Sequence, residues 1–176
     1  SPVAVVAAPF SYEQLVSIDQ TLDEIAASVH VDFIGGFSAL VEKGIARGDR
    51  ALIEAIPYAL SQTERVCASV NVASSKAGIN MDAVLLMGKI MSERNMHADA
   101  INNLKLAKEN GVSGADVFLY LGKSSYALGQ YSEAEKYFGL AAYKDPSDPR
   151  PLNGLADTYI GVRKYDKSME AWEKAA

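Results

Sequence analysis

The chain has 176 residues, of which 49% are hydrophobic and 22% are charged, values typical of a folded globular protein built as one domain or one repeat array. Its net charge of -5 argues against nucleic acid as a partner, because phosphate binding requires clustered lysine and arginine. No apolar run approaches the roughly 18 residues that a membrane-spanning helix needs, so direct membrane insertion is not expected.

The first ten residues predict an extended tail, and a first helix follows it. Ser11 with Gln14 three places on forms a capping box, a pattern that marks a helix start. Apolar residues then recur at intervals of three and four, so that one face of the helix is made to be buried. We expect this stripe to pack on the chain's own second helix, with docking onto another protein as the alternative. The stripe consists of Leu15, Ile18, Leu22, Ile25 and Val29.

Two further helices are predicted before residue 80. The second runs from near Asp32 to Gly48, and the third runs from Asp49, its capping residue, to about Val72. Pro57 predicts a kink or a short break in the third helix. The single cysteine, Cys67, lies in the apolar run of this helix and is expected to be a buried thiol. Residues 11–80 are therefore predicted to form helical hairpins that end in a flexible joint at 71–80.

From residue 81 onward one pattern returns every 34 positions without insertion. It divides 81–176 into three units, 81–114, 115–148 and 149–176, of which the last is incomplete. Small residues recur at three of the repeated positions, and large apolar residues recur beside them. Two of these positions, those of Gly88 and Ala100, allow two helices to approach closely. The equivalent sets are Met87, Leu121 and Leu155; Gly88, Gly122 and Ala156; Ala100, Ala134 and Ser168; Leu104, Phe138 and Trp172; and Ala107, Ala141 and Ala175.

This spacing resembles the tetratricopeptide repeat, a helix-turn-helix unit of 34 residues. The middle unit matches the repeat best, because Gly122, Ala134, Phe138, Ala141 and Pro146 all fall in place. The resemblance implies an all-α fold, a right-handed superhelical array of helix-turn-helix units, preceded by divergent helical hairpins in 11–80. Asp145 with Pro146 is expected to end the second helix of the middle unit, and Asn110 with Gly111 that of the first.

Signals of enzymatic chemistry are weak. Gly35-Gly36-Phe37 leads into a predicted helix without the lysine that a phosphate-binding loop requires. The two histidines, His30 and His97, are far apart and form no metal-binding pair. We therefore expect a protein without catalytic residues, metal site or cofactor.

The resemblance implies instead a concave groove, lined by the first helix of each unit, that binds a peptide or a protein segment. Lysines at equivalent positions would attract acidic groups, and leucines with a tyrosine would supply apolar area. The partner-binding residues that the resemblance implies are Leu85, Lys89, Leu119, Lys123, Tyr126, Arg150, Asn153 and Asp157.

The leading hypothesis is a non-enzymatic scaffold or adaptor that binds a protein or peptide partner in this groove. The alternative is a structural subunit of a larger assembly, such as a secretion, pilus or organelle scaffold, which self-associates or docks through its N-terminal helix and the ends of the array. A regulatory appendage of an enzyme is a third possibility. No compartment follows from the sequence; a cytoplasmic location is favoured over a periplasmic or envelope-associated one. Repeat scaffolds share a core and differ in surface, so fold alone does not identify the partner.

Overall fold

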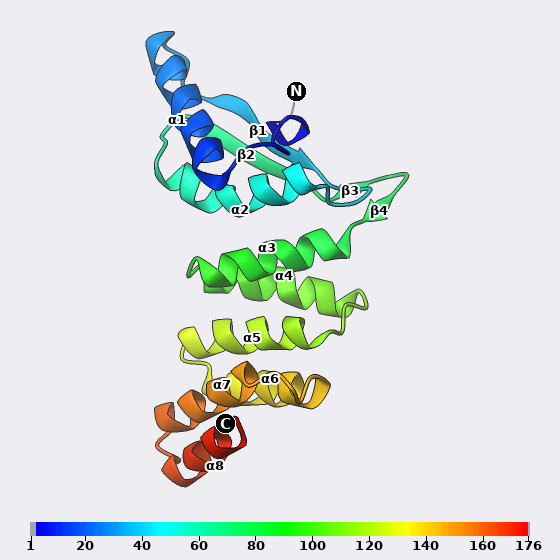
Figure 1. Cartoon of the computed structure of the whole chain (residues 1–176), viewed down its shortest axis with the longest axis vertical. Helices are drawn as coiled ribbons and strands as arrows, with labels where there is room; N and C mark the ends of the chain where they lie inside the picture. Colours follow the sequence, from blue (N-terminus) through cyan, green and yellow to red (C-terminus); the bar gives the residue numbers. More distant parts are fainter. Residues whose placement is uncertain (1–2, 176) are drawn as a thin grey trace. The chain divides into compact units, whose positions relative to one another are not determined.

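The computed structural model describes residues 3–175, and the chain divides into two compact units, Ser1–Ala83 and Val84–Ala176 (Figure 1). The chain is mostly helical. Each unit is described by itself below.

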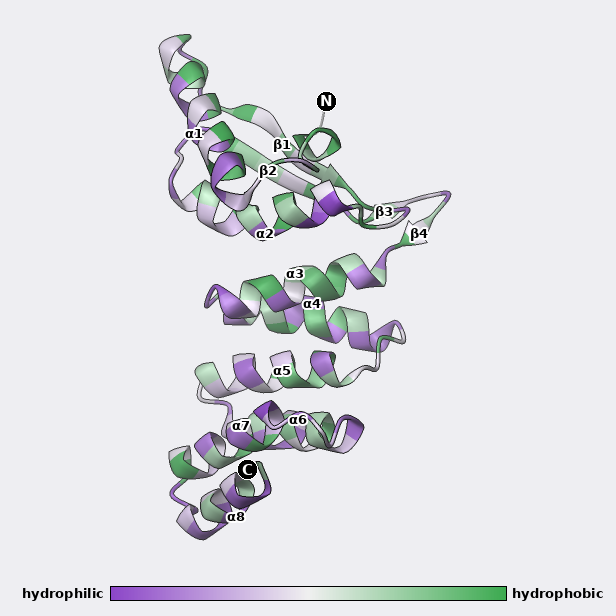
Figure 2. Cartoon of the chain, viewed as in Figure 1, coloured by the Kyte–Doolittle hydropathy of each residue, from purple (hydrophilic) through white to green (hydrophobic). Residues whose placement is uncertain are grey.

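The second unit is a row of helices joined by short turns, and the predicted helical repeat array is confirmed. Each helix contacts the next along the chain from α4 to α8, and α5 also contacts α7, so that the first helices of successive pairs lie beside each other (Figure 1). Every helix carries both apolar and hydrophilic residues (Figure 2). The helices are α3 (Met81–Glu93), α4 (His97–Glu109), α5 (Ala115–Ala127), α6 (Tyr131–Lys144), α7 (Arg150–Gly161) and α8 (Tyr165–Ala175).

The turn inside each helix pair has the same backbone conformation. Asn95, Gly129 and Arg163, which are 34 positions apart, all have positive φ, at 62°, 70° and 59°. In each turn the next backbone N–H donates to a carbonyl five residues earlier, as Gln130 does to Ser125 at 2.9 Å. This is the left-handed helix end that favours glycine, and two of the three turns form it without one.

The connections between pairs end the second helices as expected. Gly111 has a φ of 96°, and α6 stops at Lys144 immediately before Asp145 and Pro146. Proline cannot continue a helix and restricts the residue before it, so the chain turns here toward the next pair.

The core of the array is built on aromatic and leucine side chains that pack against glycine. An added Cβ at Gly88 would lie 2.7 Å from Leu104 Cγ, and one at Gly122 would lie 2.6 Å from Phe138 Cδ1. Phe138 also packs on α7, where a Cβ at Gly154 would lie 2.5 Å from its Cζ. The Phe138 ring therefore holds two first helices at once, and both contacts require glycine.

The first unit contains strands as well as helices. Strands β1 and β2 pair in parallel, with Phe37 opposite Ala68 and Leu40 opposite Asn71, and α2 connects them as the helix of a βαβ unit. Strands β3 and β4 form a small antiparallel hairpin. The elements are η1 (Val3–Val5), α1 (Tyr12–Ser28), β1 (Ile34–Leu40), α2 (Arg47–Ser61), β2 (Val66–Asn71), β3 (Ala73–Ser74) and β4 (Gly78–Ile79).

The helix predicted from Asp32 to Gly48 is wrong, because strand β1 forms at Ile34–Leu40 and the next helix, α2, begins only at Arg47. Phe37, Ala39 and Val41 are buried at alternate positions while Leu40 is 53% exposed, a period of two that belongs to a strand. Gly36 has a φ of 119°, which a helix does not accept. The apolar residues at 33, 37, 40 and 41 satisfy a helical spacing by coincidence.

The third predicted helix is confirmed in its first half only. It begins at Arg47, passes through Pro57 and ends at Ser61, and β2 replaces the rest. Cys67 lies on the outer side of β2 and is exposed, which corrects its interpretation as a buried thiol. The expected extended tail is also wrong for Val3–Val5, which form a short 3-10 helix; residues 1–2 lie outside the described residues.

Helix α1 begins with the predicted capping box, in which Ser11 and Gln14 hydrogen-bond reciprocally. Its apolar stripe is buried at Leu15 and exposed at Ile25 and Val29, so only the first part packs within the unit. The fully buried Asp19 accepts a hydrogen bond from Thr63 Oγ1 at 3.1 Å, and burial raises the pKa of this carboxyl group.

We predict that Gly122→Ala destabilises the array, because its Cβ would overlap the Phe138 ring. Overpacking costs about 1–3 kcal/mol, which exceeds the gain of up to about 1 kcal/mol from helix propensity. Gly139→Ala in α6 is the matched control, because a Cβ there meets nothing within 4 Å. Urea unfolding followed by the fluorescence of Trp172, the single tryptophan, should show a lower midpoint for Gly122→Ala and an unchanged or higher one for Gly139→Ala. Equal midpoints would contradict the packing argument.

Candidate partner-binding site

A pocket of about 280 Å³ lies between the first helices α5 and α7. Its lining combines two aromatic rings, two cationic side chains, one carboxylate and one amide. The residues that line it are Lys123, Tyr126, Phe138, Arg150, Asn153, Gly154 and Asp157.

Helical spacing brings these residues together. Lys123 and Tyr126 are three apart on α5, and Arg150, Asn153 and Asp157 are three and four apart on α7, so each set shares one face of its helix. Because Gly154 has no side chain, the Phe138 ring of α6 reaches the bottom of the pocket between them.

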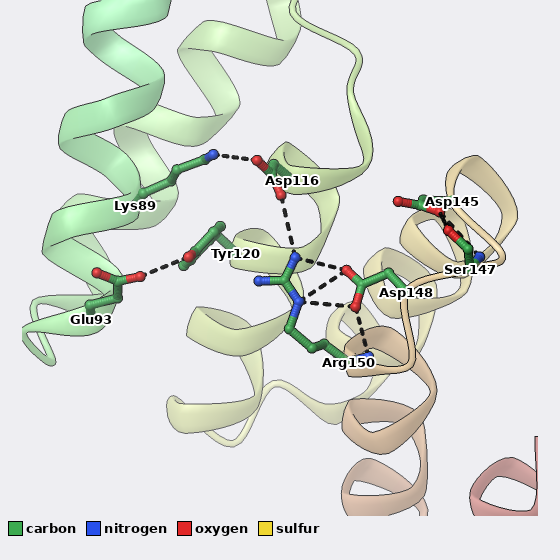
Figure 3. Close-up of polar contacts among 8 residues, drawn as sticks. All are labelled: Lys89, Glu93, Asp116, Tyr120, Asp145, Ser147, Asp148 and Arg150. Atoms are coloured by element: carbon green, nitrogen blue, oxygen red, sulfur yellow. Dashed lines mark hydrogen bonds and ion pairs between the residues drawn. The ribbon is translucent and has the colours of Figure 1, made fainter. Parts of the chain in front are cut away.

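A polar network beside the pocket links α3, α5 and α7, the first helices of the three repeats (Figure 3). Asp116 at the start of α5 receives a hydrogen-bonded ion pair from Lys89 of α3. The other oxygen of Asp116 lies 3.8 Å from Arg150 Nη2. Arg150 in turn binds Asp148 through both Nη2, at 2.8 Å, and Nε, at 2.9 Å to Oδ1. One carboxylate thus connects α3 with α7.

The contact between Arg150 and Asp148, at the end of this network, has two effects. The hydrogen bonds from Arg150 hold the pKa of the Asp148 carboxyl group below its ordinary value. Such a bidentate contact is stronger and more directional than a simple ion pair. Arg150 is therefore already engaged by two carboxylates, and it acts in this structure as a link between helices.

Tyr120 stands at the centre of the same surface. Its hydroxyl donates to Glu93 Oε1 at 2.7 Å, which ties α5 to α3 (Figure 3). The ammonium groups of Lys89 and Lys123 lie 5.6 and 5.0 Å from the centre of its ring, within the range of a cation–π contact. Burial raises the pKa of Tyr120 to about 12, and the hydrogen bond to Glu93 acts in the same direction.

The predicted site residues divide into three groups. Five line the pocket: Lys123, Tyr126, Arg150, Asn153 and Asp157. The second group is Lys89, which is engaged by Asp116 beside the pocket.

The third group is the pair of leucines. Leu119 is only 1% exposed, and Leu85 is partly buried against the same core. The expectation that Leu119 offers apolar area to a ligand is therefore wrong. It lies one position from Tyr120 on α5 and points into the helix contacts.

The partner-binding residues expected from the sequence do not include the groups that organise the site. Phe138 and Gly154 form its floor, and Asp116, Tyr120 and Glu93 form the network around it. A sequence signal existed for one of them, because Asp116 is an acidic residue in the first turn of α5, 27 positions after Lys89 of the preceding repeat.

Lys123 is the cation best placed to meet a ligand. It is exposed, it lines the pocket, and among residues 3–175 no carboxylate lies within ion-pair distance of it. Tyr126 offers a ring that is 38% exposed and is held edge-on against Tyr131 at 5.8 Å. Asn153 supplies an amide that both donates and accepts hydrogen bonds. The arrangement can bind an acidic group next to an apolar one.

The described part of the chain lacks two other kinds of feature, a metal-binding cluster and a membrane-spanning helix. No group of three histidine, cysteine, aspartate or glutamate side chains gathers there as a metal ion would require. None of the described helices has the length and apolar character needed to cross a membrane.

A family model described as uncharacterised ACR (DUF711) matches residues 1–118, which extend from the first unit into α5. Curated relatives are described as UPF0210 proteins. The one from Desulfovibrio desulfuricans is 66% identical over 89 residues, which make up 51% of this chain and 19% of the relative. The one from Syntrophobacter fumaroxidans is 60% identical over 109 residues, or 60% of this chain and 24% of the relative. The chain thus spans about a fifth to a quarter of the length of these relatives.

Among solved structures, the one titled MamA MSR-1 C2 is similar, with a TM-score of 0.52 and 19% identity, over 73% of this chain and 64% of that one. MamA contains tetratricopeptide repeats, so the likeness supports a fold of that type. The matching family model, however, is not one of tetratricopeptide repeats. The resemblance inferred from the sequence therefore holds for the fold.

We predict that Tyr120→Phe weakens the dependence of stability on alkaline pH. Because the folded pKa is about 12 and the ordinary value is about 10, the neutral hydroxyl stabilises the fold below pH 10 and this contribution is lost as pH rises toward 12. The variant should be less stable than the wild type at pH 8, since Glu93 loses its donor, and the difference should shrink between pH 10 and 12. Urea midpoints at pH 8, 10 and 11 measure it. Tyr143→Phe, at an 81% exposed position, is the control, and its urea midpoint should equal that of the wild type at all three pH values. A constant difference for Tyr120→Phe would contradict the prediction.

Proposed function

This chain belongs to the DUF711 family, and from its helical repeat array we propose that it is a non-enzymatic adaptor that binds a protein segment between α5 and α7. The observation that carries the proposal is the pocket itself. Five residues implied as partner-binding by the repeat resemblance line it together.

The chemistry of the pocket defines the segment. Lys123 and the Asn153 amide favour an acidic side chain or a terminal carboxylate, because both can donate hydrogen bonds to it. Phe138, Gly154 and the ring of Tyr126 favour an apolar side chain beside that acid. Asp157, on the same face of α7, opposes a second acidic group one turn further along and favours a basic or neutral residue there. A short segment with an acidic and an apolar residue side by side meets these conditions.

The polar network supports binding by holding the helices in place. Asp116 and Arg150 connect three first helices before any ligand arrives, so a partner meets a surface that is already ordered. A preorganised surface loses less conformational freedom on binding. It also leaves Lys123, rather than Lys89 or Arg150, as the principal cation for the ligand.

We predict that Lys123→Glu weakens peptide binding by about tenfold or more, because it places a carboxylate where the ligand's acid would bind. Peptides are selected from a displayed random library on the full chain and their dissociation constants are then measured by calorimetry. Lys105→Glu is the matched control, since Lys105 is an exposed lysine on the second helix α4. The wild-type affinity should also fall as salt rises from about 50 to 300 mM.

Selected peptides that bind Lys123→Glu and wild type equally would exclude this pocket as their site. A selection that enriches no peptide with an acidic and an apolar residue adjacent would count against the proposed ligand chemistry.

A second candidate is a structural subunit that associates through the end of the array. It is favoured by α8, where Tyr165, Met169 and Trp172 are 60%, 60% and 46% exposed. The residues equivalent to Trp172, Leu104 and Phe138, are 0% and 2% exposed. An apolar face of this kind is typical of a surface that another helix covers.

If α8 mediates assembly, the mass of the full chain by light scattering should rise with concentration and return to that of a monomer in Trp172→Glu. Tyr143→Glu, a change at an exposed aromatic residue of α6, should leave the mass as in the wild type. Lys123→Glu should have no effect on it. A monomer at all concentrations would remove this candidate and leave the adaptor.

A further inference from the structure

A second pocket of about 250 Å³ lies on another face of α7, between α7 and α8. Helix α7 contributes Leu152, Leu155 and Tyr159 to it, whereas Arg150, Asn153, Gly154 and Asp157 face the first pocket. Helix α8 contributes the rest of the lining: Lys167, Glu170, Ala171 and Lys174. The walls are apolar and the rim is charged.

The preceding repeat, residues 115–148, shows which side chain fits such a space. Ala171 stands 34 positions after Tyr137, and Leu152 and Leu155 stand 34 positions after Phe118 and Leu121. In the middle unit the phenol of Tyr137 is 4% exposed and belongs to the buried core with Phe118 and Leu121. In the third unit the methyl group of Ala171 replaces that ring, and Leu152 and Leu155 are only partly buried. The pocket thus occupies the position that a tyrosine side chain fills one repeat earlier.

The charged rim of this pocket differs from the equivalent surface of the middle repeat in the sign of one charge. That charge determines which polar group a ligand should present there. Burial raises the pKa of the Tyr137 hydroxyl and the nearby Glu133 carboxylate acts in the same direction, whereas Lys167 occupies the position of Glu133 in the third repeat. The ammonium of Lys167 lies 5.6 Å from the centre of the Tyr159 ring at the pocket. A lysine donates hydrogen bonds and accepts none, so the guest should present an acceptor there. The oxygen of a phenol meets this requirement.

We propose that this pocket binds a tyrosine side chain of a partner protein. The ring packs against Leu152, Leu155 and the Ala171 methyl group, and the hydroxyl oxygen accepts from the Lys167 ammonium. The backbone of the partner remains at the charged rim, where Lys174 and Glu170 lie on successive turns of α8. The site is independent of the pocket between α5 and α7 and of any ligand bound there.

The first test uses p-cresol, which is the tyrosine side chain alone, and the full chain labelled with ¹⁵N. Saturable amide shifts are expected around Leu152, Leu155 and Ala171, with a dissociation constant on the order of 1 mM for a ligand of this size. Toluene, which lacks the acceptor, should bind several-fold more weakly. Shifts that do not saturate, or that appear only around Lys123 and Asn153, would overturn the proposal.

Variants separate the pocket from the rest of α8. Ala171→Tyr supplies the missing ring from within the chain and should abolish saturable p-cresol binding. Met169→Tyr adds the same residue at a position outside the lining of the pocket and should leave binding unchanged. Lys167→Met should remove the preference for p-cresol over toluene while toluene still binds, which tests the hydrogen bond without filling the pocket. Binding of p-cresol that survives in Ala171→Tyr would overturn the assignment.

The source of the ring is tested with N-acetyl-tyrosinamide, in which the side chain is attached to a peptide backbone. It should bind the wild type at least as tightly as p-cresol does, and N-acetyl-alaninamide should not bind. Binding of free p-cresol alone would indicate a small phenol as the ligand and would overturn the proposal of a partner's side chain.

Discussion

The packing of one aromatic ring against two glycines determines the geometry of the array. Phe138 lies against Gly122 of its own unit and Gly154 of the next, and a Cβ at either position would overlap the ring. The ring therefore sets how closely α5 and α7 approach. Because Gly154 leaves it uncovered on one side, the same ring forms the floor of the candidate site. The Phe138 ring thus belongs to both the core and the candidate site, so a substitution of Phe138 would alter both.

Charge is arranged on this framework so that two of the three cations at the candidate site are already paired with carboxylates. Lys89 is held by Asp116, and Arg150 is held by Asp148 and Asp116, which leaves Lys123 on the rim. Two lysines at equivalent repeat positions thus have different roles, one between helices and one toward solvent. The difference arises from an aspartate in the next repeat and cannot be recognised from the lysines themselves. Equivalent positions in a repeat share a backbone environment, while their partners depend on the neighbouring unit.

The array was predictable because its signal is long and redundant. Three units of the same length repeat glycine, alanine and large apolar residues, and a wrong register would place Gly88 or Gly122 where no close contact exists. The βαβ unit gave a weaker signal. Phe33, Phe37, Leu40 and Val41 satisfy helical spacing, and short apolar runs of this kind do not separate a strand from a helix. The alternation of Phe37, Ala39 and Val41 after two glycines was the better indication.

For the candidate site, the sequence could predict only which residues share one face of a helix. Which residues share a face of α5 or α7 follows from spacing, and five of the expected residues do line the pocket. Burial of Leu119 depends on how closely neighbouring helices pack, and engagement of Lys89 depends on a residue 27 positions away. Both are properties of contacts between repeats, which a pattern read within one repeat does not contain.

The chain has one thiol and one indole, and each lies in a different unit. Cys67 is exposed on the outer side of β2, and Trp172 is partly exposed on α8. A dye attached to the thiol would accept excitation energy from the indole to an extent that depends on the distance between them, without any substitution in the chain. These 176 residues therefore contain one energy donor and one labelling point with which the separation of the two units in solution, and its response to a ligand, can be followed.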